Sequence, residues 1–350
     1  MRLADAAEPV FARHETFHPR YGWFRKAVAA AAEDPGVFSA PDATVELGVG
    51  KNMVKAIRFW GLAAKLIENT PNPPGSPAKR TRNVVPTEFG RLLFDPSSGW
   101  DPFMEDPGTL WLLHWKLLSP RSQLPVWWVA FNQFNAIEFD FSDLESACRG
   151  GIASGAEWPA PHESSLRKDL SALLRTYAPA ERTAHSRVED LLDCPLRELG
   201  LIVRSQATGN YRFAMGPKPT LPPAVAACVV LDYIAYCEPT ARTVLLSRMS
   251  TEPGAPGRAF RLSEAELADA LRQAVEFSDG ALDLASPAGA AQLVWRGEAA
   301  ELAKALLDRY YLVGLERLGG LERATHSTVS EMTGASAQRA LVPGPVGVVR

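Results

Sequence analysis

Apolar residues recur at the spacing of an α-helix along most of this 350-residue chain, and this pattern constrains the fold more than any other feature. In residues 21–34, for example, Phe24, Ala27, Val28 and Ala31 fall on one face of a helix. Comparable helical patterns cover residues 51–68, 87–95, 164–177, 225–236, 263–275 and 298–311. We therefore expect a mainly α fold, and a chain of this length, at roughly 150 residues per domain, is expected to be multi-domain.

Polar residues mark the starts of several of these helices. Asp42 and Thr87 stand directly before helical patterns and are predicted to act as N-caps. Ser263 is followed three residues later by Glu266, which is the spacing of a capping box. These positions fix where the predicted helices begin.

Residues 1–95 contain the order of elements of a winged helix-turn-helix. After the helix over 21–34, a short helix is predicted over 42–48, and a longer one begins at Lys51 after a tight glycine turn. Two short strands, Leu66–Glu68 and Asn83–Pro86, are predicted to flank a loop rich in Pro and Gly. This order predicts a winged-helix-like module.

A second winged-helix-like module is predicted over residues 156–221. Helices over 164–177 and 187–201 precede two extended stretches, and Ala-Thr-Gly-Asn at 207–210 between those stretches is typical of a hairpin turn. The remaining segments are expected to be a Trp-rich acidic helical connector over 96–155, a C-terminal helical domain over 222–318 and a flexible tail over 319–350.

The connector holds five of the nine tryptophans, all between Trp100 and Trp128. Because the segment is acidic and would repel phosphates, these rings are expected to form core rather than a base-stacking surface. His114, which stands between two of the tryptophans, is expected to be a hydrogen-bonded structural residue rather than a catalyst.

The net charge of −3 conceals a strong charge asymmetry between neighbouring segments. Residues 48–93 carry eight basic and two acidic side chains, a net charge of +6, whereas residues 94–145 carry two basic and eight acidic ones, a net charge of −6. Lys51, Lys55 and Arg58 share one face of the predicted helix. Lys51 lies in the first turn, where the helix dipole is already positive, so a bound anion would relieve an unfavourable charge.

These features predict that the protein binds duplex DNA. Lysine and arginine side chains would contact phosphates, whereas Asn52 and Arg58 would reach base edges. Arg167 and Lys168 form a weaker cationic face in the second module. The predicted DNA-binding residues are Lys51, Asn52, Lys55, Arg58, Lys79, Arg80, Arg82, Arg167 and Lys168.

Two other functions remain open at this level. The first is a protein-interaction scaffold, in which the segments of charge +6 and −6 meet between or within chains. The second, more remote, is a zinc hydrolase, because His14, Glu15 and His18 spell HExxH. That motif needs both imidazoles on one helix face, and Pro19 disfavours a helical conformation at His18. The function expected is therefore non-enzymatic, with no cofactor and no metal.

The sequence also favours a cytoplasmic protein without a membrane partner. It has no run of about 18 apolar residues, and its first residues lack the apolar core of a secretory signal. Its four cysteines show no CxxC spacing, as is usual for thiols in a reducing compartment. No small-molecule substrate is evident from the motifs.

Several motifs resemble the bacterial domain-of-unknown-function family 4007. The matching stretches are His14-Glu-Thr-Phe17, Arg20-Tyr-Gly-Trp23, LGVGKNMVKAIRFW at 47–60, EDPGTLWLLHWKLLS at 105–119 and LDCPLRELGLI at 192–202. The resemblance covers about residues 11–315. Members of the family are often encoded beside sulfotransfer proteins of the phosphoadenosine-phosphosulfate-reductase type, which belong to DNA phosphorothioation and related phage-defence systems. The resemblance thus implies a DNA-binding accessory protein that works with the protein partners of such a system.

Overall fold

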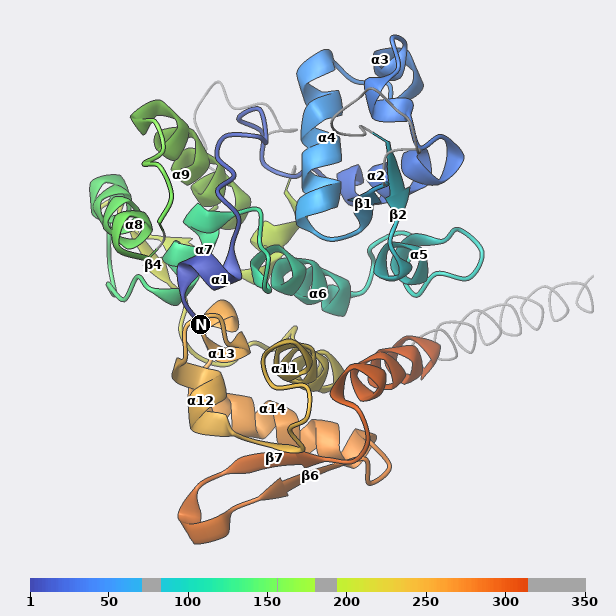
Figure 1. Ribbon diagram of the computed structural model, residues 1–350. Helices are drawn as coiled ribbons and strands as arrows, with labels where there is room; N and C mark the ends of the chain where they lie inside the picture. The colour runs from blue at the N-terminus through green and yellow to red at the C-terminus, as the bar shows by residue number, and fades with distance from the viewer. Residues whose placement is uncertain (71–82, 156, 180–193, 314–350) are drawn as a thin grey trace, which may run out of the picture. The chain divides into compact units, whose positions relative to one another are not determined.

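The computed structural model describes residues 1–70, 83–155, 157–179 and 194–313 and is mainly helical, as the periodicity predicts (Figure 1). The helices are α1 Leu3–Ala6, α2 Trp23–Glu33, α3 Ala43–Glu46, α4 Lys51–Ala63, α5 Glu88–Phe94, α6 Pro107–Leu118, α7 Pro125–Asn132, α8 Phe141–Gly155, α9 Glu163–Tyr177, α11 Pro223–Cys237, α12 Leu246–Thr251, α13 Pro256–Phe260, α14 Glu264–Phe277 and a last helix over 299–313. The short 3₁₀ helices are η1 Val37–Ser39, η2 Pro195–Leu199 and η3 Pro287–Gly289. The strands are β1 Ile67–Asn69, β2 Val84–Pro86, β3 Ile202–Arg204, β4 Tyr211–Phe213, β5 Thr243–Leu245, β6 Leu282–Ala285 and β7 Gln292–Trp295.

The chain divides into two compact units, Met1–Leu307 and Asp308–Arg350. The finer boundaries expected at residues 95, 155 and 221 stay predictions, and the tail over 319–350 lies outside the described residues. Within the described ranges, no helix combines the length and the apolar character needed to cross a bilayer.

The first part of the chain has the elements that the sequence predicts. The face of α2 that carries Phe24 and Val28 is buried, and Gly61 of α4 allows α2 to approach so closely that an added Cβ would lie 2.8 Å from that of Ala27. β1 and β2 are antiparallel, and Ile67 pairs with Pro86. Thr87 caps α5 by accepting a hydrogen bond from the Gly90 amide, whereas Asp42 stands before α3 without a side-chain capping bond.

The Trp-rich segment forms the centre of the first unit. Trp111 and Trp115 on α6, and Trp127 and Trp128 on α7, are fully buried, which confirms that these rings are core. α6 packs on α11, and α7 packs on α8, α9 and α13. Burial on all sides of α6 and α7 explains why their sequences are apolar all round.

The acidic residues of the same segment mostly serve local structure. The Asp95 carboxylate accepts hydrogen bonds from Ser97 and Ser98, and Asp106 caps α6 at the Gly108 amide. Asp101 is buried and accepts from two backbone amides and from the Thr109 hydroxyl at 2.6 Å. These hydrogen bonds leave the carboxylates charged, and Glu105, Glu138, Asp140 and Asp143 of the same segment are exposed.

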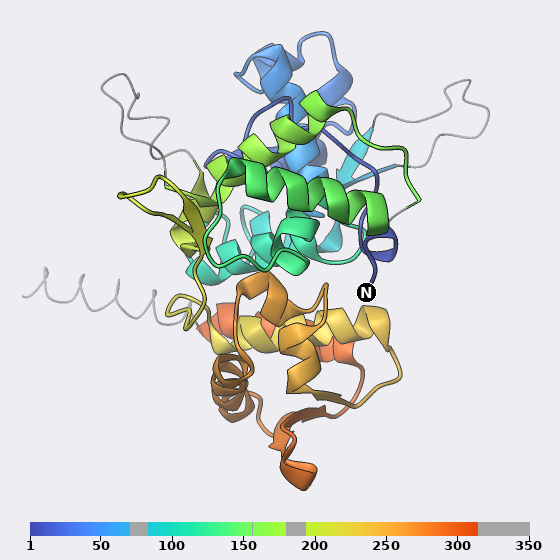
Figure 2. The same cartoon turned by 90° about the vertical axis from the view of Figure 1, so that its left-hand side faces the viewer.

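The second predicted module has its first helix and its hairpin. α9 packs beside α8, and β3 pairs with β4 in antiparallel register, with Ile202 opposite Phe213 (Figure 2). The helix predicted over 187–201 is wrong for its described part. Residues 195–199 form the 3₁₀ helix η2 because Pro195 opens a short turn, and residues 187–193 lie outside the described ranges.

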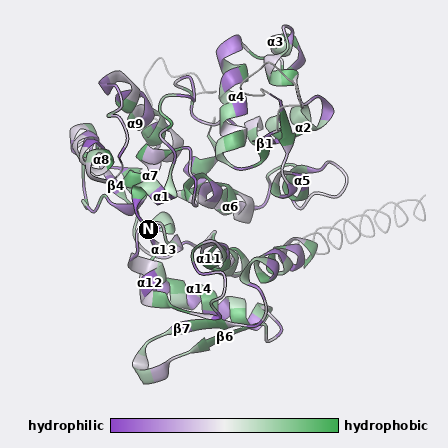
Figure 3. Ribbon diagram, viewed as in Figure 1, coloured by the Kyte–Doolittle hydropathy of each residue, from purple (hydrophilic) through white to green (hydrophobic). Residues whose placement is uncertain are grey.

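The C-terminal domain was expected to be helical throughout, and the structure corrects this. α11 is buried as predicted, and Ser263 and Glu266 form the capping box, but β5, β6 and β7 make a three-stranded sheet in the order β5-β7-β6. The strands have three or four residues each, too few for alternation to identify them. In Figure 3, α11 is coloured mainly as hydrophobic, whereas α4 also carries hydrophilic residues.

Candidate nucleic-acid interface

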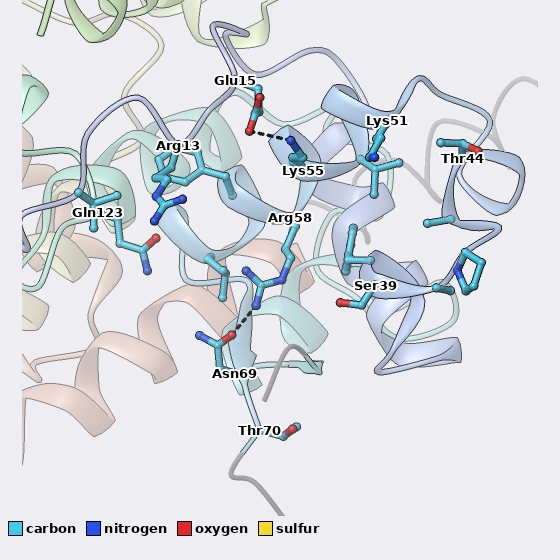
Figure 4. A pocket seen from close by; sticks show the side chains of 18 of the residues that line it. Arg13, Glu15, Ser39, Thr44, Lys51, Lys55, Arg58, Asn69, Thr70 and Gln123 are labelled. Atoms are coloured by element: carbon cyan, nitrogen blue, oxygen red, sulfur yellow. Dashed lines mark hydrogen bonds and ion pairs between the residues drawn. The ribbon is translucent and has the colours of Figure 1, made fainter. Parts of the chain in front are cut away.

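A groove of about 1520 Å³ runs along α4. Lys51, Lys55 and Arg58, which the sequence places on one helix face, all line it, and Arg13 joins them from the segment before α2 (Figure 4). The facing wall comes from η1 and α3, with Ser39 and Thr44 among its residues. Within the described lining, the carboxylates are Glu8 and Glu15.

The N-terminus of α4 opens at one end of this groove. Gly50 precedes the helix and has no side chain that could cap it, and Lys51 and Asn52 are exposed in the first turn. Positive charge from the helix dipole and from the Lys51 ammonium group therefore add together at this end. Such an end favours an anionic ligand.

Lys55 is held by a weak surface ion pair. Its Nζ lies 3.3 Å from Glu15 Oε1 and donates to Asn52 Oδ1 at 3.4 Å. The Lys55 side chain is 51% exposed and that of Glu15 31%, and ion pairs this open to water contribute at most about 1 kcal/mol to stability. A phosphate could therefore replace Glu15 beside Lys55 at little cost.

Arg58 reaches the other end of the groove. Its Nη2 donates to Asn69 Oδ1 at 2.6 Å, so that the guanidinium group lies beside the last residue of β1 (Figure 4). Three predicted residues of the following segment, Lys79, Arg80 and Arg82, lie outside the described ranges. The side chain of Gln123 adds an amide to the same space.

Two cations counted in the sequence do not reach the groove. Lys65 turns inward, where its Nζ donates to the carbonyl oxygens of Ser119 at 3.1 Å and Pro120 at 3.0 Å, and burial lowers its pKa to about 7. Arg91 donates to the Pro86 carbonyl. The net charge of +6 therefore overstates the cationic surface around α4.

Arg167 and Lys168 lie on α9 and are not among the residues that line the groove. Arg167 Nη1 is 2.8 Å from Glu145 Oε2, and its guanidinium group lies over the Phe141 ring at 5.2 Å. Arg13, by contrast, is a groove residue that sequence reasoning missed. It sits in an irregular segment with no helical pattern, so no periodic signal could have placed it beside α4.

The three residues of the HExxH motif lie outside any helix: His14 and Glu15 are in a turn, and His18 is in the irregular segment that follows. Glu15 has a φ of 51°, and His14 is buried with its Nε2 2.7 Å from Asp169 Oδ1. His18 is buried as well, and burial together with nearby arginines lowers its pKa to about 3. Within the described ranges, no three His, Cys, Asp or Glu side chains are grouped as metal ligands would be.

His14 and Asp169 instead fix the segment that borders the groove. Asp169 Oδ1 also accepts from the Ala12 amide at 2.9 Å, so one carboxylate on α9 holds two positions of the turn. Burial raises the pKa of Asp169, while the hydrogen bond from His14 opposes that rise. This buried contact keeps Arg13 and Glu15, the neighbours of His14, at the mouth of the groove.

The chain is similar to solved structures of SspB. One is 40% identical with a TM-score of 0.82, covering 88% of this chain and 90% of that chain. A magnesium-bound structure of SspB is 39% identical with a TM-score of 0.81, covering 89% of this chain and 90% of that chain. No curated protein matches the chain. The family model described as "Protein of unknown function (DUF4007)" matches residues 11–311, and the chain belongs to this family.

Proposed function

We propose that the protein is a DNA-binding accessory or regulatory protein that holds duplex DNA against α4. The observation that carries this proposal is the groove in which Lys51, Lys55, Arg58 and Arg13 converge. The described lining of the groove holds four cationic side chains and two carboxylates, and the N-terminus of α4 has no side-chain cap. This excess of positive charge would attract a polyanion. Phosphate contacts of this kind position a protein on DNA without regard to sequence.

The order of elements supports a winged helix-turn-helix as the means of binding. α2, α3 and α4 are followed by the antiparallel pair β1–β2, and α3 and α4 are separated by a turn that contains Gly48 and Gly50. In such a module the second helix of the pair enters the major groove. Asn52 and Arg58 would then face base edges, and the loop with Lys79, Arg80 and Arg82 would be the wing.

For the biological setting we rely on what the family resemblance implies, and we propose that this chain works in a DNA phosphorothioation or phage-defence system. The scaffold alternative keeps support from the acidic segment over residues 94–145, because hydrogen bonds leave a carboxylate charged and Glu138, Asp140 and Asp143 are exposed.

The test is the salt dependence of binding to a labelled duplex of about 25 base pairs, plain and phosphorothioated, followed by fluorescence anisotropy. If about four phosphates are neutralised, the logarithm of the association constant should fall against the logarithm of salt with a slope near −3.6. Lys51→Ala should reduce the magnitude of the slope by about 0.9. Arg296→Ala, an exposed arginine that follows β7 and lines no part of the groove, is the matched control and should leave the slope unchanged.

An affinity that does not change with salt would contradict the proposal. The scaffold gains support instead if Lys51→Glu leaves DNA retention intact and abolishes binding to a partner protein.

Because one similar structure contains magnesium, the DNA should also be recovered and run on a denaturing gel after incubation with Mg²⁺. DNA whose strands have been altered would contradict a purely accessory role.

A further inference from the structure

A second hollow, of about 330 Å³, lies on the exposed face of α9. Ser164, Lys168, Ser171 and Arg175 follow one another along this face at intervals of three or four residues. Arg167 and Thr16 complete the lining, so every described residue of the hollow carries a hydroxyl group or a positive charge. Converging hydroxyl and cationic donors are the groups that bind phosphate oxygens in proteins.

Further cations gather behind this hollow. The Nε atom of Arg197, on η2, donates to the Arg175 carbonyl at 2.9 Å, and the pKa of Arg175 is lowered by burial and by the charge of Arg197. Both guanidinium groups, with that of Arg20, also act to lower the pKa of His18. Like charges held together cost free energy, and a bound anion would offset that cost.

The carboxylate of Glu145 pairs with Arg167, which lines the hollow. Glu145 accepts from Arg167 Nη1 at 2.8 Å and from Arg149 Nη2 at 2.9 Å, so a single negative charge is shared between two arginines. Lys168 is exposed to solvent at the opening. The hollow therefore keeps a positive balance despite this ion pair.

The hollow and the α4 groove adjoin at one turn of the chain. Glu15 lines the groove and Thr16 lines the hollow, and the Cα atoms of consecutive residues are about 3.8 Å apart. Arg175 donates to the Thr16 carbonyl, just as Lys55 pairs with Glu15. Figure 1 shows this segment, in dark blue, passing between α4 and α9. A polyanion that crosses the turn would meet both cationic faces.

We infer that the α9 hollow is a second phosphate site, which binds the sugar-phosphate backbone of the same DNA that the α4 groove holds. The inference rests on the proposed function, and it extends the contact from one helix to two. Hydroxyl groups from Ser171 and Thr16 would supply neutral donors, and Lys168 and Arg175 the charge, whereas the Ser164 hydroxyl is already 2.8 Å from His162 Nδ1.

The experiment compares Lys168→Ala with Lys51→Ala in the full chain, using the same duplex over a range of KCl concentrations. Lys168→Ala should weaken binding roughly five- to tenfold near 0.1 M salt and reduce the magnitude of the salt slope by about 0.9. Lys168→Arg, which keeps the charge, should restore most of the affinity, and Arg296→Ala should behave as the unaltered chain. Equal melting temperatures of the variants would show that folding is unaffected.

The outcomes separate the two proposals. Normal binding by Lys168→Ala together with weakened binding by Lys51→Ala would overturn the second site and leave the groove in place. If only Lys168→Ala weakens DNA binding, the α9 site is supported and the α4 groove is contradicted. If neither variant weakens binding, both sites are contradicted. A melting temperature that inorganic phosphate raises in the unaltered chain but not in Lys168→Ala, with DNA affinity unchanged, would identify a site for free phosphate and overturn the backbone contact.

Discussion

Glu15 lies beside Lys55, where the proposed binding mode would place a DNA phosphate. The pair is 3.3 Å apart and partly exposed, so the carboxylate competes with an anionic ligand rather than stabilising the fold strongly. The backbone of Glu15 is in the left-handed region, with a φ of 51°, and the turn is held by the buried contact of His14 with Asp169. The position of Glu15 is therefore set by its neighbours rather than by the ion pair.

Glu15→Gln should accordingly bind duplex DNA more tightly than the unaltered chain. The substitution removes a negative charge from the groove and frees Lys55, and we expect a three- to tenfold gain at low salt, on the order of 1 kcal/mol. Fluorescence anisotropy at 50 and 200 mM KCl measures this. Glu276→Gln, an exposed residue of α14 that lines neither hollow, serves as the control for loss of one carboxylate. Equal affinities of the two variants would show that Glu15 does not compete with DNA.

At the scale of elements, a glycine sets how closely α5 approaches the start of β1. A Cβ added at Gly90 would lie 2.1 Å from the carbonyl oxygen of Leu66, and this carbonyl is fixed by hydrogen bonds from Thr87. Because the obstacle is backbone, it cannot move aside as a flexible side chain would. α5 in turn holds β2 next to β1, at the edge of the proposed interface.

Gly90→Ala should therefore destabilise the protein by about 3 kcal/mol, measured by urea unfolding. Gly150→Ala is the matched control, because Gly150 lies within α8 and has open space around its Cα. There the higher helix propensity of alanine should add about 0.5–1 kcal/mol to the free energy of unfolding. If both substitutions changed the free energy of unfolding in the same direction, the close approach at Gly90 would be contradicted.

Short-range signals of this kind are what the sequence predicts well. Thr87 and the Ser263–Glu266 pair cap their helices as expected, and the strands beside the loop after α4 lie within one residue of their predicted places. Each depends on residues a few positions apart. The side-chain bond expected at Asp42 is absent because the residue before α3 has a ψ of 7°, outside the extended region that N-caps adopt.

For the whole molecule, two buried histidines link stability to pH. His114 is completely buried, with Nε2 donating to the Ala259 carbonyl at 2.9 Å and Nδ1 2.8 Å from the Tyr177 hydroxyl, so its neutral form is satisfied, as expected. Burial lowers the pKa of His114 to about 4 and that of His18 to about 3, whereas both lie near 6.5 in the unfolded chain. Below pH 6.5 the unfolded chain therefore binds more protons at these two histidines than the folded protein does.

Stability should consequently fall as the pH drops from 6.5 towards 4, and further towards 3. His114 alone should contribute a loss of about 2 kcal/mol between pH 7 and pH 4.5. Urea unfolding of the unaltered chain and of His114→Gln at these two pH values measures it. His114→Gln will be less stable than the unaltered chain at pH 7. Its free energy of unfolding should, however, fall by about 2 kcal/mol less between pH 7 and pH 4.5 than that of the unaltered chain. Equal differences would show that His114 is protonated in the folded state.

The sequence by itself determined the mainly helical character, the starts of helices, two of the hairpins and the cationic face of α4, because each depends on periodicity or on contacts between near neighbours. The tertiary structure alone decided that Arg13 joins that face, that Lys65 turns away from solvent, and that β5 pairs with β7. These depend on segments far apart in the chain, whose meeting is fixed by the packing of helices around the buried tryptophans. No local pattern encodes which distant partner a loop residue or a three-residue strand will find.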